Sequence, residues 1–232
     1  MTRGEMEDEL AIRIGEYLGT TTNDNPLARR RAVWRSADRV AEATMCLHTG
    51  RTVNLVADQS EYCPPDLLAV TSVLSKDSAN HWTNLPVATR AHMDKITGGA
   101  WRDTMTAAYP TMVAVTGPNR IRVYPTPSTS ITSGLRIEGY YKPGITWVYN
   151  SSGVAQDPAT TDECPLPTFS HACVVEGALL DRLQALVVQN PQLSSAIQIV
   201  NNTYRTLLGD VEAFTGRHYQ SVANGTPRRL YN

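Results

Sequence analysis

The chain has 232 residues, of which 41% are hydrophobic and 19% are charged, and its formal net charge is -1. This length and composition are typical of a folded globular protein, either one domain or one body with an insertion, and they exclude disordered and fibrous classes. The near-neutral charge excludes a dedicated nucleic-acid-binding protein, because neutralising phosphates requires clustered Lys and Arg side chains.

The N-terminal residues and the cysteines indicate the cellular compartment in which the protein is made. Acidic residues are mixed with apolar ones in residues 1–18, unlike a secretory signal, and no apolar run reaches the length of a membrane span. The four cysteines are scattered without CxxC spacing, at Cys46, Cys63, Cys164 and Cys173. We therefore expect a protein made in the cytoplasm, with no membrane partner and with ordinary buried thiols.

Residues 1–50 are predicted to form a pair of helices. Apolar residues recur four apart from Leu10 to Leu18, the spacing that places side chains on one helical face. The dipeptide Asn25-Pro26 is typical of an N-cap followed by a first-turn proline, so a second helix is predicted to begin there. Gly50 is the predicted stop of that helix.

Residues 51–145 are predicted to form an antiparallel β insertion, because the apolar period changes to two over most of this segment. The turn residues Gly117-Pro118-Asn119 separate two such runs, 112–116 and 120–124, which we expect to pair as an antiparallel hairpin. Residues 83–106 follow neither period and are predicted to be short helix and loop. Further strand positions are predicted at Val53, Leu55, Val70, residues 72–74, Leu135 and Ile137.

Residues that interrupt helices and strands divide the rest of the chain into a loop, a pair of helices and an arm. Residues 146–167 are rich in Pro, Gly, Ser and Asn and are predicted to be a long loop. Residues 168–220 regain helical spacing and predict an antiparallel helical hairpin, with Asn190-Pro191 ending the first helix and capping the second. Residues 221–232 lose that spacing and are predicted to be an extended arm. The predicted fold class is α+β, a helical body of N-terminal helix pair and C-terminal hairpin with an antiparallel β-sheet insertion.

The sequence offers no local signature of catalysis. It has no GxSxG elbow, no glycine-rich phosphate loop and no familiar zinc spacing, so we assign no catalytic, cofactor-binding or metal-ligating residue. The best local metal-like cluster is Cys164, His171 and Cys173. We interpret Cys173 as a small core residue and His171 as a polar residue of a first helical turn. Arg29-Arg30-Arg31 spreads over most of a helical turn and is predicted to be a solvated face.

Several short motifs follow one another along the chain in a recognisable order. Tyr-x-Pro-Pro-Asp-Leu precedes one strand, Tyr-Pro-x-Pro ends another, Tyr-Tyr-Lys-Pro ends the next, and an acidic pair with Leu-Pro introduces the C-terminal helices. This order, over about residues 10–214, resembles the head-to-tail connector (adaptor, neck) proteins of tailed bacteriophages. The motif positions are Tyr62, Pro64, Pro65, Asp66, Tyr124, Pro125, Pro127, Pro143, Pro165 and Pro167.

The resemblance implies a structural protein and not an enzyme, without a cofactor, that assembles as a ring beneath the portal. The ring is expected to be a dodecamer that joins capsid to tail and provides a conduit for the genome. The expected partners are the portal protein, a tail or tail-nozzle protein, other copies of the chain, and passing double-stranded DNA without sequence-specific binding. The expected location is the neck of the virion, after a period in the host cytoplasm.

Two segments are candidate docking sites. The arm ends in two arginines and two large apolar residues that a monomer would expose, and we expect it to dock on the portal or on a neighbouring copy. The loop carries aromatic residues among residues that interrupt helices and strands. We expect this loop to contact the tail or to line the lumen. The residues are Arg228, Arg229, Leu230 and Tyr231 in the arm and Trp147, Val148 and Tyr149 in the loop.

Two other classes remain open at this point. A carbohydrate- or peptide-binding β module of a phage tail would use Trp82, Trp101 and Trp147 as a stacking surface. A cell-wall hydrolase of the tail would bring acidic residues from different loops together.

Overall fold

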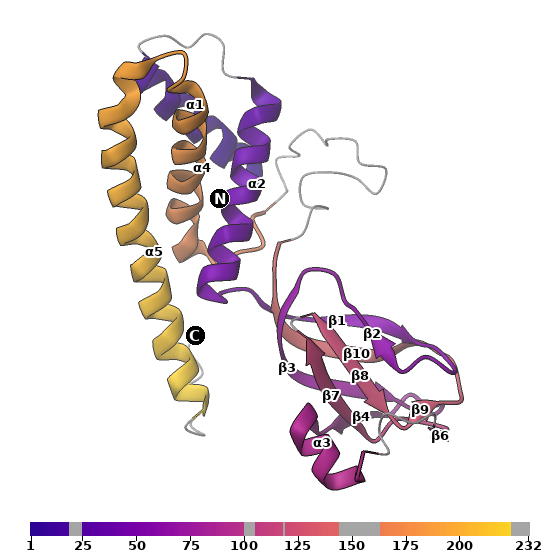
Figure 1. The fold of residues 1–232 in the computed structure, drawn as a ribbon. Coiled ribbons are helices and arrows are strands. Elements are labelled where there is room, and N and C mark those ends of the chain that lie inside the picture. The colour runs from indigo at the N-terminus through magenta and orange to yellow at the C-terminus, as the bar shows by residue number, and fades with distance from the viewer. Residues whose placement is uncertain (19–24, 100–104, 118, 144–162, 224–232) are drawn as a thin grey trace, which may run out of the picture. The chain divides into compact units, whose positions relative to one another are not determined.

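A computed structural model describes residues 1–18, 25–99, 105–117, 119–143 and 163–223, and it divides the chain into two units (Figure 1). The helical unit comprises residues 1–47 and 142–232, and the β unit comprises residues 48–141. The β unit is therefore an insertion between two helical parts of the chain. This arrangement confirms the predicted α+β class with a β-sheet insertion.

Helix α4 is the central helix of the helical unit. Residues of α4 are buried around most of its circumference, as expected for a helix that other helices surround. It packs against each of the other three long helices, and Figure 1 shows it between α2 and α5. The four helices are α1 (Arg3–Leu18), α2 (Pro26–Thr44), α4 (His171–Leu186) and α5 (Ser194–Ala223).

The core of the helical unit consists of apolar side chains from all four helices. The periodicity between Leu10 and Leu18 correctly predicted the buried face of α1, where Leu10 and Ile14 are buried. In α4 the helical spacing correctly predicted that Val175, Leu179 and Leu183 are buried, whereas Ala172 of the same predicted stripe is exposed. Further buried members are Met6, Val33, Val40, Val174, Leu179, Leu183, Val200 and Val211. Because these residues come from both ends of the chain, the helical unit forms only when the two ends meet.

The start of α2 confirms the predicted N-cap, whereas the end of α2 does not confirm the predicted stop at Gly50. The side chain of Asn25 accepts a hydrogen bond from the backbone N–H of Leu27 at 2.9 Å, and Pro26 occupies the first turn. The helix ends at Thr44, and Met45 takes a left-handed conformation with φ 50. Gly50 is therefore not the stop of α2, because it already lies in the following strand.

The β unit contains two four-stranded sheets and one two-stranded sheet. The strand orders are β1-β10-β3-β4, β2-β8-β7-β5 and β6-β9. The strands are β1 (His48–Leu55), β2 (Glu61–Tyr62), β3 (Leu67–Lys76), β4 (Trp82–Leu85), β5 (Val87–Thr89), β6 (Thr106–Ala107), β7 (Met112–Gly117), β8 (Arg120–Tyr124), β9 (Thr126–Pro127) and β10 (Ile131–Tyr141).

Strand pairing in the β unit is mainly antiparallel. β7 and β8 form the predicted hairpin, with Val113 opposite Val123, which confirms that prediction. β5 with β7 and β6 with β9 are parallel pairs, a feature that the sequence analysis did not include. Parallel neighbours need a connection longer than a tight turn, and such pairings are not visible in local periodicity.

Residues 83–106 were predicted as helix and loop, and the strands in this segment correct that prediction. β4 pairs with the end of β3 and β5 pairs with β7, while the helix α3 (Arg90–Thr97) follows. Thr89 caps α3 by accepting a hydrogen bond from the backbone N–H of His92, and Gly98 ends it with φ 60. The two strands are short, so their pairing depends on neighbours and not on their own pattern.

The C-terminal hairpin departs from the prediction at its turn and at its end. A 3-10 turn, Thr168–Ser170, precedes α4, and another, Pro191–Leu193, precedes α5. Asn190 makes no side-chain cap, because the 3-10 turn comes between it and α5. The helix α5 continues to Ala223, so residues 221–223 are helical and not part of an extended arm. Among the helices that the structure describes, none combines the length and the apolar character needed to cross a membrane.

Candidate functional site

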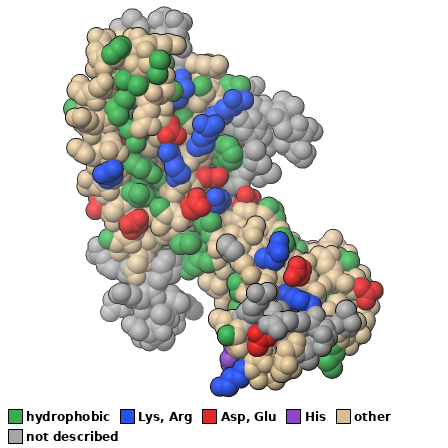
Figure 2. All heavy atoms as spheres, viewed as in Figure 1, with side chains coloured by type: hydrophobic (Ala, Val, Ile, Leu, Met, Phe, Trp, Pro, Cys, Tyr) green, Lys and Arg blue, Asp and Glu red, His purple; other side chains and the backbone are tan. Residues whose placement is uncertain are grey.

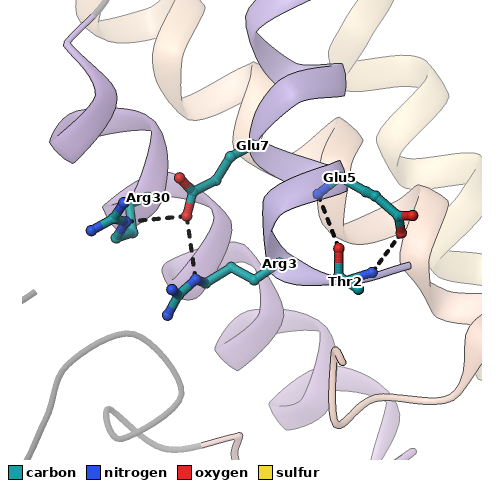
Figure 3. Close-up of polar contacts among 5 residues, drawn as sticks. All are labelled: Thr2, Arg3, Glu5, Glu7 and Arg30. Atoms are coloured by element: carbon teal, nitrogen blue, oxygen red, sulfur yellow. Dashed lines mark hydrogen bonds and ion pairs between the residues drawn. The ribbon is translucent and has the colours of Figure 1, made fainter. Parts of the chain in front are cut away.

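A buried group of charges ties α1 to α2 (Figure 3). Glu7 Oε1 lies 3.2 Å from Arg30 Nε and 3.5 Å from Arg3 Nε. Burial raises the pKa of the Glu7 carboxyl, even though the two arginines act in the opposite direction. Because desolvation opposes the charged carboxylate, a buried contact of this kind is weak evidence for stability. It joins Arg3 and Glu7 of α1 to Arg30 of α2.

The same arrangement corrects the prediction for the arginine triplet. Arg30 is only 8% exposed, whereas Arg31 is exposed, so the triplet is not a uniformly solvated face. Arg30 is drawn inward because Glu7, on another helix, provides a buried carboxylate. Figure 3 also shows a reciprocal cap at the start of α1, in which Thr2 N–H donates to Glu5 Oε2 and Glu5 N–H donates to Thr2 Oγ1.

Helix α4 carries two further ion pairs to its neighbours. Arg13 of α1 pairs with Glu176, whose side chain is only 3% exposed. Despite burial, which acts in the opposite direction, the hydrogen bond and the charge of Glu176 raise the pKa of Arg13. Arg39 of α2 pairs with Asp181 at 2.8 Å and donates to the carbonyl of Gly177. These pairs position α1 and α2 on α4.

The exposed side of α1 is acidic. Asp8, Ile12 and Glu16 follow one another at four-residue steps and therefore lie on one face of the helix. Glu5 and Glu9 are also exposed and flank this line. Ile12 is 65% exposed, which is high for a large aliphatic side chain. We call these five residues the acidic stripe.

Helix α2 exposes three arginines, and it also exposes Glu42 near its end. Arg31, Arg35 and Arg39 also follow one another at four-residue steps. Figure 2 shows Lys and Arg side chains on this face of the helical unit, with Asp and Glu side chains among them. A pocket of about 230 Å³ lies beside them, between α2 and α4. We call this pocket the basic groove, and it is lined by Ala28, Arg31, Ala32, Arg35, Asp181, Arg182 and Ala185.

The structure places both cysteines of the group Cys164, His171 and Cys173 inside the protein. Cys164 and Cys173 are buried, and burial raises the pKa of Cys164 to about 11 and the pKa of Cys173 to about 12. Within the described residues, no group of three or more His, Cys, Asp and Glu side chains is arranged to hold a metal ion. Cys63 is exposed, unlike the other three cysteines, because it lies in the connection that leads from β2 toward β3.

His171 gives a pH-dependent prediction. Its side chain is buried at the start of α4, with Nε2 2.9 Å from the Leu166 carbonyl oxygen, and burial lowers its pKa. Its contribution to stability is fully present above the unfolded pKa of about 6.5 and is lost as the pH falls toward the lower folded pKa, because the unfolded chain binds the proton first. We therefore expect stability to fall as the pH drops from 7 toward 5.

Thermal unfolding between pH 7 and pH 5 would measure this effect in the wild type and in His171→Gln. Glutamine keeps a donor for the Leu166 carbonyl but does not titrate, so the variant is expected to show a weaker pH dependence. His81 is largely exposed, and His81→Gln is the control. An unchanged pH dependence in His171→Gln would contradict the assignment.

The motif positions from Tyr62 to Pro127 lie in the β unit, whereas Pro143, Pro165 and Pro167 lie in the helical unit. Tyr62 is buried, and its hydroxyl accepts from Val56 N–H and donates to the Gln59 carbonyl. Asp66 has φ 62 and lies 3.6 Å from Arg51. Tyr124 is half-buried. Among the prolines of the motifs, Pro64, Pro125, Pro127 and Pro143 are buried, Pro167 is half-buried, and Pro65 and Pro165 are exposed.

The two candidate docking segments are not placed by the structure. Residues 228–231 of the arm and residues 147–149 of the loop lie outside the described residues. Of the three tryptophans of the carbohydrate-binding alternative, only Trp82 is described, with 41% exposure and with Lys76 over its ring at 5.7 Å. Trp101 and Trp147 lie outside the described residues.

The sequence analysis missed the acidic stripe, the basic groove and the partner of Arg13. One signal for the stripe was available, because Ile12 falls outside the apolar line from Leu10 to Leu18 and is surrounded by acidic residues. No comparable signal links Arg13 to Glu176, which is far away along the chain.

The α+β fold with its inserted β unit carries charged side chains both within the packing of its helices and on its exposed faces. The chain belongs to the SU10 adaptor protein family, a family of phage adaptor proteins, whose model matches residues 1–228. This match confirms the resemblance to phage adaptors. None of the curated proteins compared with the chain matches it.

Proposed function

We propose that the protein assembles as a ring between the portal and the tail of a phage and gives the genome a path through its centre. The observation that carries this proposal is the family match, because it spans both the helical unit and the inserted β unit. A ring that matches the portal would be a dodecamer located in the virion neck. The proposed role is structural and requires no catalytic residue.

The net charge of the chain supports a role in which DNA passes through the ring without being bound tightly. A protein that neutralises several phosphates binds DNA tightly and with strong salt dependence. With a formal net charge of -1, the chain has no excess of cations for such binding. Double-stranded DNA would therefore pass without sequence-specific contacts.

The docking segments remain proposals within this function. Arg228, Arg229, Leu230 and Tyr231 would attach the protein to the portal or to a neighbouring copy, and Trp147, Val148 and Tyr149 would contact the tail or the lumen. Because α5 continues to Ala223, a deletion of residues 224–232 removes the arm without shortening the described helix. Normal portal binding after this deletion would exclude the arm as the anchor.

Mass photometry of the purified protein, alone and mixed with the portal protein of the same phage genome, tests the proposal. We expect a ring-sized complex that depends on the portal, because the portal supplies the symmetric platform for a closed ring. A protein that stays monomeric and ignores the portal would contradict the adaptor role. Binding to a glycan array by such a monomer would instead favour the carbohydrate-binding alternative.

A further inference from the structure

We propose that neighbouring copies in the ring join through the acidic stripe of one copy and the basic groove of the next. This inference rests on the proposed ring and names the surfaces that would hold it together. Both surfaces belong to the helical unit, so every copy carries one of each. A contact between two different surfaces is head-to-tail, and repeated head-to-tail contacts close into a ring when the rotation allows.

The charges of the acidic stripe favour a cationic partner. Glu5, Asp8, Glu9 and Glu16 are all exposed on α1. Of the two basic residues in this helix, Arg3 is buried and Arg13 pairs with Glu176. Asp8, Glu9 and Glu16 therefore present negative charge to solvent that a basic surface of another copy can complement.

The basic groove has the opposite character. Arg31, Arg35 and Arg182 line it together with a single carboxylate, Asp181, which already pairs with Arg39. Arg31 and Arg182 also have contacts within their own chain, so the proposal depends on their charge and not on a missing partner. Because the whole chain is nearly neutral, the separation of the exposed acids of α1 from the arginines that line the groove makes a second copy the complementary partner.

The shapes of the two surfaces also correspond. Ile12 is 65% exposed, with Asp8 one turn before it and Glu16 one turn after it. In the groove, three small side chains, Ala28, Ala32 and Ala185, lie between the charged ones, and the pocket of about 230 Å³ can hold one branched aliphatic side chain. The proposed contact places Ile12 among these alanines, with its flanking carboxylates against the arginines. An apolar anchor surrounded by charge pairs is typical of protein interfaces.

Charge reversal on each surface tests the contact in the ring assay with the portal. Asp8→Lys with Glu16→Lys reverses the two charges that flank Ile12, and Arg31→Glu with Arg35→Glu reverses two of the three arginines of the groove. Each double variant alone is expected to assemble at least about a hundredfold more weakly, because like charges then meet beside Ile12 at every contact. The four-substitution chain again places opposite charges beside Ile12 and is expected to recover ring formation. An equal mixture of the two double variants is also expected to recover it, by alternation.

Controls separate loss of folding from loss of contact. Circular dichroism of each variant reports the helical unit, and recovery by the four-substitution chain shows that the reversed residues are tolerated. Arg205→Glu with Asp210→Lys reverses two exposed charges on α5 and is expected to leave the ring unchanged. Ile12→Ser is expected to weaken assembly without a change in net charge.

The outcomes distinguish this inference from the proposed function. If the wild type forms no ring with the portal, the proposed ring assembly itself is wrong. If the wild type forms the ring and both double variants also form it with unchanged affinity, the ring stands and the stripe-to-groove contact is overturned. If Arg31→Glu with Arg35→Glu abolishes binding to double-stranded DNA while ring formation is unaffected, the groove is a DNA contact and the inference is likewise overturned.

Discussion

Replacing Arg13 with glutamine is expected to lower the free energy of unfolding by about 3–5 kcal/mol, because it leaves a buried carboxylate without its cation. Glu176 is only 3% exposed, and Arg13 is its partner from α1. The raised pKa of Arg13 indicates that the pair is favourable in the folded protein despite the cost of burial. Urea denaturation followed by circular dichroism would measure the change, as the shift of the midpoint at constant slope.

Two further variants make the Arg13 result specific. Arg205→Gln removes an exposed arginine of α5 and is expected to change stability by no more than about 0.5 kcal/mol. Adding Glu176→Gln to Arg13→Gln removes the isolated charge and is expected to restore much of the lost stability. Equal stabilities for Arg13→Gln and Arg205→Gln would show that the pair does not hold α1 on α4.

Replacing Gly177 with valine is expected to destabilise the helical unit by about 1–3 kcal/mol or more through overpacking. A Cβ atom at this position would lie 2.3 Å from Ser36 Oγ and 2.8 Å from Tyr204 Cε2. Ser36 belongs to α2 and Tyr204 to α5, so the glycine lets both helices approach α4. The added side chain has no space unless α2 or α5 moves away. Thermal unfolding of the variant would measure the loss.

Gly209→Val is the matched control for Gly177→Val. Gly209 also lies within a helix, but nothing lies within 4 Å of a Cβ atom built there. The difference between the two valine variants therefore reports helix packing and not helix propensity. Ser36→Ala combined with Gly177→Ala should recover part of the loss in Gly177→Ala, since Ser36 Oγ is the nearest atom. Equal stabilities for the two valine variants would contradict the close approach.

The ring-joining contact and these packing predictions concern different sides of the same helices. Arg13 and Gly177 face the interior of the helical unit, whereas Asp8, Ile12 and Glu16 face outward. Variants of the first group are expected to lower stability in the monomer. Variants of the second group are expected to leave the monomer folded and to act only on assembly.

Local features of the sequence were sufficient to predict the class of the fold. Helical spacing in α1 and α4, the Asn25 cap and the β7–β8 hairpin each depend on residues close together in the chain. The family resemblance also came from short motifs in a fixed order, and the match over residues 1–228 confirms it. The predictions for the segment that forms β4 and β5 and for the end of α2 were wrong. The two strands depend on their pairing partners, and α2 ends where Met45 takes a left-handed conformation.

The sequence by itself therefore determined the α+β class, the inserted β segment and the adaptor family, since periodicity, caps and motif order are local. Only the tertiary structure decided which charges are buried and which are exposed. Arg30 is buried because Glu7 on another helix meets it, Arg13 meets Glu176 across the length of the chain, and Gly177 lies where three helices converge. The same packing leaves the acidic stripe and the basic groove outside the core. Contacts between distant residues depend on how helices pack, which no local pattern encodes.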